Sequence, residues 1–220
     1  TRAMALALAA MLVLSGCGGT SNGGSSTEGE SGDQESAKNE IKDLVIPMAV
    51  SRELETFNIL YAQRQEDSEN LTNLVDGLLE VDTKGKLVPA IAKEWGTEDG
   101  GLTWTFKLRE GVKFHDGNVM TSEDVCFSFE RAMSSGVVST YFNYLDSIEP
   151  DGDNAVIMHL KMPYAQLYQA LSNPSAVVVS KKAVEQYGDD FAKNPSGTGA
   201  YKLKEWKQAD SITLEAFEDY

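Results

Sequence analysis

His115 and Asp116 form the one adjacent pair of an imidazole and a carboxylate in this 220-residue chain. Such a pair could act as a general base with its orienting acid. Asp116 is followed by glycine, however, and an Asp-Gly sequence after an alternating apolar run favours a hairpin turn. His159 is the only other histidine, and the sequence contains no HExxH, CxxC or GxxxxGK[ST] motif. We therefore predict no catalytic residue, no metal site and no cofactor.

Two further patterns suggest chemistry but have simpler explanations. Gly197-Thr198-Gly199 begins like a dinucleotide-binding loop, but Lys202 stands where the third glycine belongs, so we predict a turn. The 34 Asp and Glu residues could include the acid/base pair of a glycoside hydrolase. No spacing singles out two of them, and acidic side chains usually form a solvated surface. A hydrolase of the cell envelope remains the less favoured alternative.

Cys17 follows an apolar run that has the anatomy of a signal peptide. Residues 3–14 are all Ala, Leu, Met or Val. As a helix this run is about 18 Å long, too short for a hydrocarbon core of about 30 Å. Small residues then precede Cys17, as cleavage requires. Leu14-Ser15-Gly16-Cys17 resembles the bacterial lipobox, which implies that residues 1–16 are a lipoprotein signal peptide and that Cys17 carries a lipid such as palmitate. An ordinary secretory signal with a chance cysteine is the alternative.

Residues 17–41 form a polar segment rich in Gly, Ser and acidic residues. This composition buries too little apolar surface to offset the entropy of ordering, so we predict a lipidated flexible tether. The whole chain has 19 Lys and Arg against 34 Asp and Glu, and the net charge of −15 repels nucleic acid and anionic lipid headgroups. With Cys17 acylated, Cys126 has no disulfide partner, and we interpret it as a small core residue.

Periodicity predicts that strands and helices interleave along the rest of the chain. Alternation over residues 102–108 predicts a half-buried strand. Thr121-x-x-Asp124 is a capping box, which predicts a helix over 122–133. Apolar residues at helical spacing predict an amphipathic helix over 71–79. The other predicted elements are short strands at 44–48, 155–162, 176–180 and 211–217, and helical segments at 87–95, 164–171 and 181–188. These elements predict an α/β fold, or a mixed α+β one.

Three ordered blocks of sequence carry a family resemblance: LVPAIAKEW, LTWTFKLREGVKFHDGNVMTSEDVCFSFER and NPSGTGAYKLKEW. They resemble the N-terminal half of the family 5 extracellular solute-binding proteins. These are receptors of ABC importers for oligopeptides and dipeptides, with nickel- and haem-binding relatives. Ala200 replaces the proline usual in the third block. The resemblance implies a periplasmic-binding-protein-like fold of two lobes around a cleft, of which this chain is an N-terminal fragment.

The resemblance also implies domain boundaries. Residues 42–69 would be the first segment of lobe I, 70–193 a smaller α/β domain, and 194–220 a truncated return to lobe I, with the second lobe missing. We expect 70–193 to be the only segment able to fold alone. The strand at 211–217 would leave its apolar residues short of partners, and an unpaired apolar edge of this kind promotes aggregation. The residues concerned are Ile212, Leu214 and Phe217.

In relatives, an extended segment corresponding to Gln63, Arg64 and Gln65 lies along the cleft and pairs with the peptide backbone. Strand addition of this kind is indifferent to side chains and suits a broad-specificity receptor, although a solvent loop is an equal alternative. Tyr141 falls near a position where relatives place a cleft aromatic, and a core aromatic is nearly as well supported.

The resemblance implies a receptor that is not an enzyme. It would be a monomer on the outer face of the bacterial cytoplasmic membrane, held there by the lipid on Cys17, and it would deliver a peptide to the permease of an ABC transporter. Nickel, haem or another solute is the alternative ligand. A purely structural lipoprotein is a third class.

Overall fold

The computed structural model describes residues 44–47, 54–62, 68 and 70–220. The chain divides into two compact units, residues 1–47 and 48–220. The described residues of the first unit, 44–47, have no regular secondary structure, so the strand predicted at 44–48 is absent there. Cys17 and the segment Gln63, Arg64 and Gln65 lie outside the described residues.

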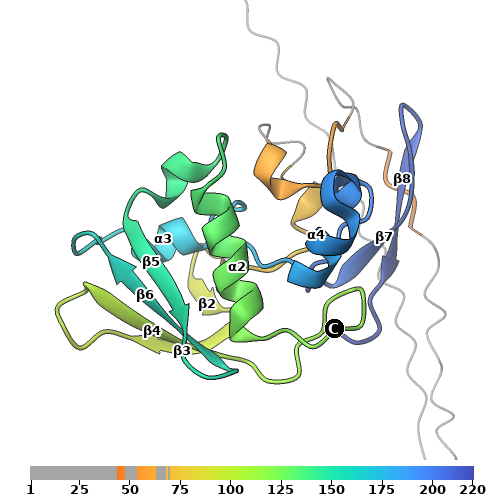
Figure 1. The fold of residues 1–220 in the computed structure, drawn as a ribbon. Coiled ribbons are helices and arrows are strands. Elements are labelled where there is room, and N and C mark those ends of the chain that lie inside the picture. The colour runs from red at the N-terminus through yellow and green to blue at the C-terminus, as the bar shows by residue number, and fades with distance from the viewer. Residues whose placement is uncertain (1–43, 48–53, 63–67, 69) are drawn as a thin grey trace, which may run out of the picture. The chain divides into compact units, whose positions relative to one another are not determined.

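A four-stranded antiparallel sheet with the order β3-β4-β6-β5 forms one side of the second unit (Figure 1). Its strands are β3 (Ala92–Gly96), β4 (Thr103–Leu108), β5 (Leu145–Pro150) and β6 (Ala155–Leu160). The strands predicted at 102–108 and 155–162 are thereby confirmed as β4 and β6. Their buried positions are in register, with Phe106 opposite Val156, so alternate side chains of both strands face the same core.

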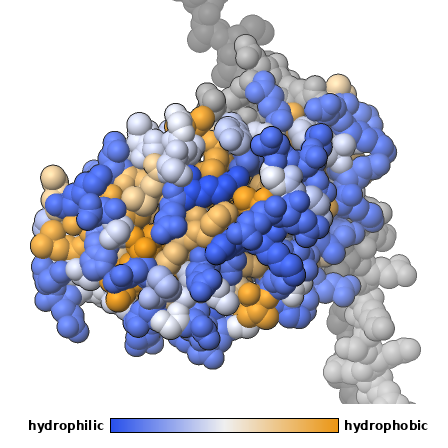
Figure 2. Space-filling model, in the orientation of Figure 1, coloured by the Kyte–Doolittle hydropathy of each residue, from blue (hydrophilic) through white to orange (hydrophobic). Residues whose placement is uncertain are grey.

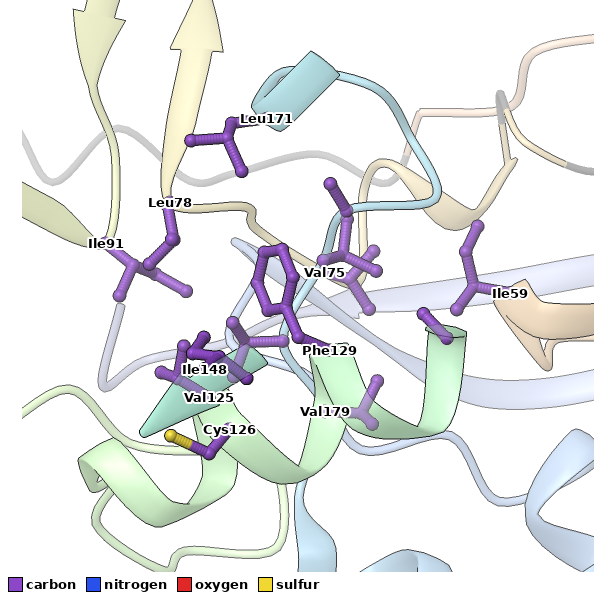
Figure 3. Packing of buried hydrophobic residues seen from close by; sticks show 14 of the residues in the cluster. Ile59, Val75, Leu78, Ile91, Val125, Cys126, Phe129, Ile148, Leu171 and Val179 are labelled. Carbon is purple, nitrogen blue, oxygen red and sulfur yellow. The ribbon is translucent and has the colours of Figure 1, made fainter. Parts of the chain in front are cut away.

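Helix α2 (Ser122–Met133) covers the inner face of this sheet. The Thr121 backbone N–H donates to Asp124 Oδ2 at 3.0 Å, which confirms the predicted helix start. Figure 3 shows Val125 near Ile148 of β5 and Phe129 pointing into the buried cluster. Cys126 is only 6% exposed, which confirms it as a core residue, and burial raises the pKa of its thiol to about 11.

The helix predicted over 71–79 is wrong. Leu71 ends a helical turn, residues 72–74 form a turn, and the segment continues extended into β1 (Leu79–Val81). Its apolar residues are buried as expected, but the backbone bonds to segments far along the chain instead of to itself. The Leu74 carbonyl accepts from Gly199 N–H at 3.0 Å, that of Asp76 from Val178 N–H at 2.9 Å, and that of Gly77 from Ile91 N–H at 3.2 Å.

The helical segment predicted at 87–95 is also wrong. It consists of β2 (Leu87–Pro89) and β3, joined by two residues that bond to the segment before β1. β2 pairs only with β1 in a two-stranded sheet, where a proline at the strand end is tolerated. Apolar spacing here fits a helix and a strand equally, and the tertiary hydrogen bonds decide between them.

Short helical segments and isolated bridges complete the described body of the unit. The helical predictions at 164–171 and 181–188 are confirmed by α3 (Leu167–Leu171) and α4 (Lys181–Tyr187). The strand predicted at 176–180 is reduced to single bridges, Gly77 to Val177 and Val179 to Gly197. The 3-10 helices are η1 (Ile59–Tyr61), η2 (Ser139–Phe142) and η3 (Gly188–Ala192). In the described part of the chain, no helix is long and apolar enough to cross a membrane.

A hairpin of β7 (Tyr201–Lys207) and β8 (Ser211–Ala216) forms the other side of the unit (Figure 1). The strand predicted at 211–217 is thus confirmed, but its apolar residues do not lack partners. Ile212 and Leu214 pack on the core beside Trp206, whose ring meets the Phe57 ring edge-on with centroids 5.1 Å apart. The Phe217 ring meets the His115 ring with centroids 5.0 Å apart. The domain boundaries at 69/70 and 193/194 stay a prediction.

Candidate ligand-binding site at the end of helix α2

The C-terminal end of α2 lies beside η1, a short helix from a distant part of the sequence (Figure 1). Arg131, in the last turn of α2, donates from Nη2 to Asn58 Oδ1 at 3.4 Å. The same Asn58 oxygen accepts the backbone N–H of Leu60 at 3.3 Å and so caps η1. Arg131 therefore connects α2 to the start of η1.

The guanidinium of Arg131 is half-buried and lies against an aromatic ring. Its Cζ is 5.5 Å from the centroid of Phe191, within cation–π distance. Burial lowers the pKa of Arg131 from its ordinary value, yet an arginine stays protonated at neutral pH. Among the described residues, no carboxylate forms an ion pair with it. We call Asn58, Tyr61, Arg131 and Phe191 the Arg131 site.

Tyr61 ends η1 and is 59% exposed. Its backbone N–H donates to the Asn58 carbonyl oxygen at 2.9 Å, so Tyr61 lies beside the residue that Arg131 bonds. The predicted peptide-pairing segment begins two residues later, at Gln63. Because Gln63, Arg64 and Gln65 fall in the part of the chain that is not described, their role remains a prediction.

Tyr141 lies in η2, which follows α2 at the same end of that helix. It is 57% exposed, whereas its neighbour Phe142 is 3% exposed and meets Phe129 edge-on at 5.8 Å. The structure thus places Tyr141 at the surface and gives the core position to Phe142. Contact between Tyr141 and a ligand stays a prediction.

An aromatic layer extends the core from Phe142. Tyr144 stacks on Tyr164 with ring centroids 5.0 Å apart and planes 5° from parallel. The Tyr144 hydroxyl is buried and has no hydrogen-bond partner among the described residues. Burial also raises the pKa of Tyr144 well above its usual range. A buried hydroxyl without a partner costs stability.

His115 lies in a tight turn and fixes a neighbouring loop. Its Nε2 lies 2.9 Å from the Gly199 carbonyl oxygen, and Gly197 N–H donates to Nδ1 at 3.4 Å. These contacts assign the neutral tautomer with the proton on Nε2, and burial lowers the pKa of the imidazole. Asp116 accepts from the Ser180 hydroxyl at 2.6 Å. The hairpin interpretation is confirmed, because Lys113 and Val119 form an antiparallel bridge across the turn at His115 and Asp116.

Gly197-Thr198-Gly199 is a crossing point of two chain segments and not a nucleotide loop. A Cβ at Gly199 would lie 2.6 Å from the Asn73 carbonyl oxygen, and one at Gly197 would collide with Leu74. Thr198 donates to the Asp76 carboxylate at 3.0 Å, and burial raises the pKa of Asp76. The loop leads into β7 and not into a helix that could hold a phosphate.

The remaining described surface offers no alternative centre of chemistry. No group of three His, Cys, Asp or Glu in the described ranges could hold a metal ion. One hollow of about 570 Å³ is lined by His115 and Trp206, among others. A second, of about 610 Å³, is lined by Asp76 and Arg109, among others. Each mixes basic and acidic side chains. Figure 2 shows a largely hydrophilic face with small apolar patches.

Solved structures share this fold. The oligopeptide-binding protein AppA from Bacillus subtilis, in complex with a nonapeptide, matches with a TM-score of 0.69 and 32% identity, covering 76% of this chain and 35% of AppA. DppA from Helicobacter pylori, an ABC transporter-associated periplasmic binding protein in complex with the peptide STSA, matches with a TM-score of 0.70 and 26% identity, covering 76% of this chain and 38% of DppA. The predicted α/β fold of periplasmic-binding-protein type is confirmed.

The sequence comparisons are more specific. Residues 86–220 match the family described as bacterial extracellular solute-binding proteins, family 5 Middle. The glutathione-binding protein GsiB of Pectobacterium atrosepticum is 33% identical over 185 residues, 81% of this chain and 35% of GsiB. AppA of Bacillus subtilis is 31% identical over 218 residues, 95% of this chain and 39% of AppA. The chain belongs to the family 5 extracellular solute-binding proteins, and it spans well under half the length of these relatives.

Proposed function

We propose that this chain is part of an extracytoplasmic receptor that captures a peptide and delivers it to the permease of an ABC importer. The observation that carries the proposal is the match to AppA, which was solved with a nonapeptide and is 32% identical to this chain over the part that matches. The relatives reported above are named as binding proteins, which supports a receptor over the hydrolase alternative.

The geometry at the end of α2 supports a peptide ligand. Tyr61 and Tyr141 present exposed aromatic rings on η1 and η2, which flank that end of the helix. Aromatic rings bury much area at small entropic cost and suit a receptor that accepts varied side chains. Backbone groups of Gln63, Arg64 and Gln65 would add the peptide as a strand, as in other β-augmentation complexes.

The lipid on Cys17 would hold the receptor on the outer face of the cytoplasmic membrane. The proposal rests on the lipobox-like sequence at 14–17 and on the polar segment that follows it. A tether of the nineteen residues 18–36 would span roughly 25 Å r.m.s. as a flexible coil. The folded part would therefore act close to the membrane, within reach of a permease.

Glutathione is a second candidate ligand, because relatives at 33% identity carry that name. It is itself a small peptide, so the two candidates differ in size more than in kind. The test incubates the receptor chain that contains this sequence with a mixed peptide digest and with reduced glutathione. The receptor is then repurified, and mass spectrometry identifies the ligands bound to it. Intact bound peptides, together with a rise in melting temperature, are the expected result.

Exclusive recovery of glutathione narrows the ligand to that tripeptide. Three other outcomes contradict the peptide proposal. Recovery of nickel or haem replaces the peptide as ligand. Steady conversion of peptides to smaller products indicates the hydrolase. The absence of any bound solute and of any thermal shift indicates a structural lipoprotein.

A further inference from the structure

Arg131 carries a positive charge that the described part of the chain does not neutralise. The sequence has 34 acidic residues against 19 basic ones, yet no described carboxylate pairs with this guanidinium. The two described side chains that contact it, Asn58 and Phe191, are both uncharged. An exposed arginine needs no partner because water solvates it, but this one is half-buried.

The position of Arg131 in the last turn of α2 explains only in part why its charge is tolerated without a carboxylate partner. A cation there is stabilised by the helix dipole, and an arginine pointing into solvent would gain the same benefit. Arg131 instead turns onto Phe191 and Asn58, and the contact with Asn58 uses one of its five N–H donors. The planar guanidinium keeps N–H donors for a further acceptor, and Tyr61, three residues after Asn58, is 59% exposed.

We propose that the Arg131 site binds a carboxylate of the captured solute, with the Arg131 guanidinium as anchor and the Tyr61 hydroxyl as a second donor. This inference rests on the peptide-receptor function proposed above and adds a ligand class to it. A guanidinium pairs with a carboxylate through two parallel hydrogen bonds, and such charge-assisted pairs are stronger than neutral ones. The carboxylate belongs to an acidic side chain or to the C-terminus of the peptide, and its chemistry is the same in both.

Three tripeptides separate the two sources. The full receptor chain is titrated by calorimetry with Ala-Glu-Ala, Ala-Gln-Ala and Ala-Gln-Ala-amide. A bound carboxylate tightens binding roughly tenfold to a hundredfold over its neutral counterpart. Tighter binding of Ala-Glu-Ala than of Ala-Gln-Ala identifies a side-chain carboxylate. Tighter binding of Ala-Gln-Ala than of its amide identifies the C-terminus.

Variants assign the preference to Arg131. Arg131→Gln is expected to abolish the preference for the carboxylate peptide, Arg131→Lys to keep part of it, and Tyr61→Phe to reduce it a few-fold. Arg109→Gln is the matched control, because it removes the same charge and also loses a hydrogen bond, from Arg109 Nε to the Ala90 carbonyl. It is expected to keep the full preference. Melting curves check that each variant is folded, and if Arg131→Gln is not, the Lys and Tyr61 variants decide.

The outcomes distinguish this inference from the function on which it rests. Equal binding of all three peptides by the wild type overturns the carboxylate site and leaves the peptide receptor in place. The carboxylate site is also overturned if Arg131→Gln keeps the preference for the carboxylate peptide. It is likewise overturned if this variant loses the same affinity for the acid and for the amide, because Arg131 then only positions η1. No binding of any tripeptide also overturns the carboxylate site, whereas the receptor itself is overturned only if no peptide is recovered from the mixed digest.

Discussion

The backbone N–H of Gly199 donates to the carbonyl oxygen of Leu74 at 3.0 Å, across more than half of the chain. This bond joins the extended segment before β1 to the loop before β7, and it needs a close approach of two backbones. A Cβ at position 199 would lie 2.6 Å from the Asn73 oxygen and 2.7 Å from the Val75 nitrogen. Glycine is therefore required at 199 for space.

Gly199→Ala is expected to lower the free energy of unfolding by about 1–3 kcal/mol, because backbone atoms cannot move aside as a flexible side chain would. Gly136→Ala is the control, since a Cβ there meets nothing within 4 Å and its φ is ordinary. Urea denaturation measures both. Equal stabilities of the two variants would contradict the close approach.

His115 makes stability depend on pH. Burial lowers the pKa of its imidazole from the ordinary value of 6.5, so the folded state favours the neutral ring. The stabilisation is fully present above that value, and it is lost as the pH falls from 6.5 towards the folded pKa, because the unfolded chain takes up the proton first. Denaturant midpoints measured between pH 8 and 5 are expected to fall over this window. His115→Gln should flatten the fall, whereas His159→Gln should keep it.

The Tyr144 hydroxyl predicts a stabilising substitution. Tyr144→Phe removes a buried hydroxyl that lacks a partner among the described residues and keeps the stack on Tyr164. The free energy of unfolding is expected to rise by about 1 kcal/mol. Tyr164→Phe serves as control, because the Tyr164 hydroxyl is at the surface and bonds Gln166 at 3.4 Å, and it should change stability by less than about 0.5 kcal/mol. A destabilised Tyr144→Phe would show that the hydroxyl has a bound partner such as water.

Local signals in the sequence predicted the elements whose contacts are local. β4 and β6 follow from alternation, and α2 follows from a capping box of only four residues, 121–124. Segments 71–79 and 87–95 could not be predicted in the same way. Their apolar spacing is compatible with a helix. Their actual form is imposed by hydrogen bonds from distant residues, such as the bond between Gly199 and Leu74, which are 125 positions apart.

The candidate site was less predictable than the fold. The place of Tyr141 came from the family resemblance, since a tyrosine in a short polar stretch carries no signal of its own. Arg131 was missed because it lies opposite the face of α2 that carries Val125 and Phe129, where a charged residue is expected to face water. On that side of the helix, Arg131 contacts Asn58, which caps η1, and Phe191 of η3. These residues are far from Arg131 in the sequence, so no periodicity connects them.

Replacement of Cys17 tests the proposed lipid anchor. Cys17→Ser removes the thiol that acylation requires, so the protein is expected to move from the membrane pellet to the medium of the producing cells. Cys126→Ser is the control, because that thiol is buried and should leave the distribution unchanged. A Cys17→Ser protein that still pellets with membranes after a high-salt wash would contradict the anchor.

Phe57 offers a test of the predicted domain boundaries. It is 1% exposed, its ring meets Trp206 of β7 at 5.1 Å, and its backbone N–H donates to the Ala192 carbonyl at 3.1 Å. Its ring therefore joins the segment before residue 70 to the hairpin after residue 194, both of which the predicted division assigns to lobe I, whereas its backbone bond reaches Ala192 inside 70–193. Phe57→Ala is expected to weaken this packing by about 3–5 kcal/mol.

If 70–193 has a core of its own, limited proteolysis of Phe57→Ala should cut before residue 70 and after about residue 194 and leave 70–193 resistant. Mass spectrometry of the fragments locates the cuts. Val119→Ala, at a side chain that is 54% exposed, should give the wild-type pattern. Digestion of 70–193 at the same rate as the ends would mean that residues 48–220 form one cooperative unit, because Phe57 then supports a core that both parts share.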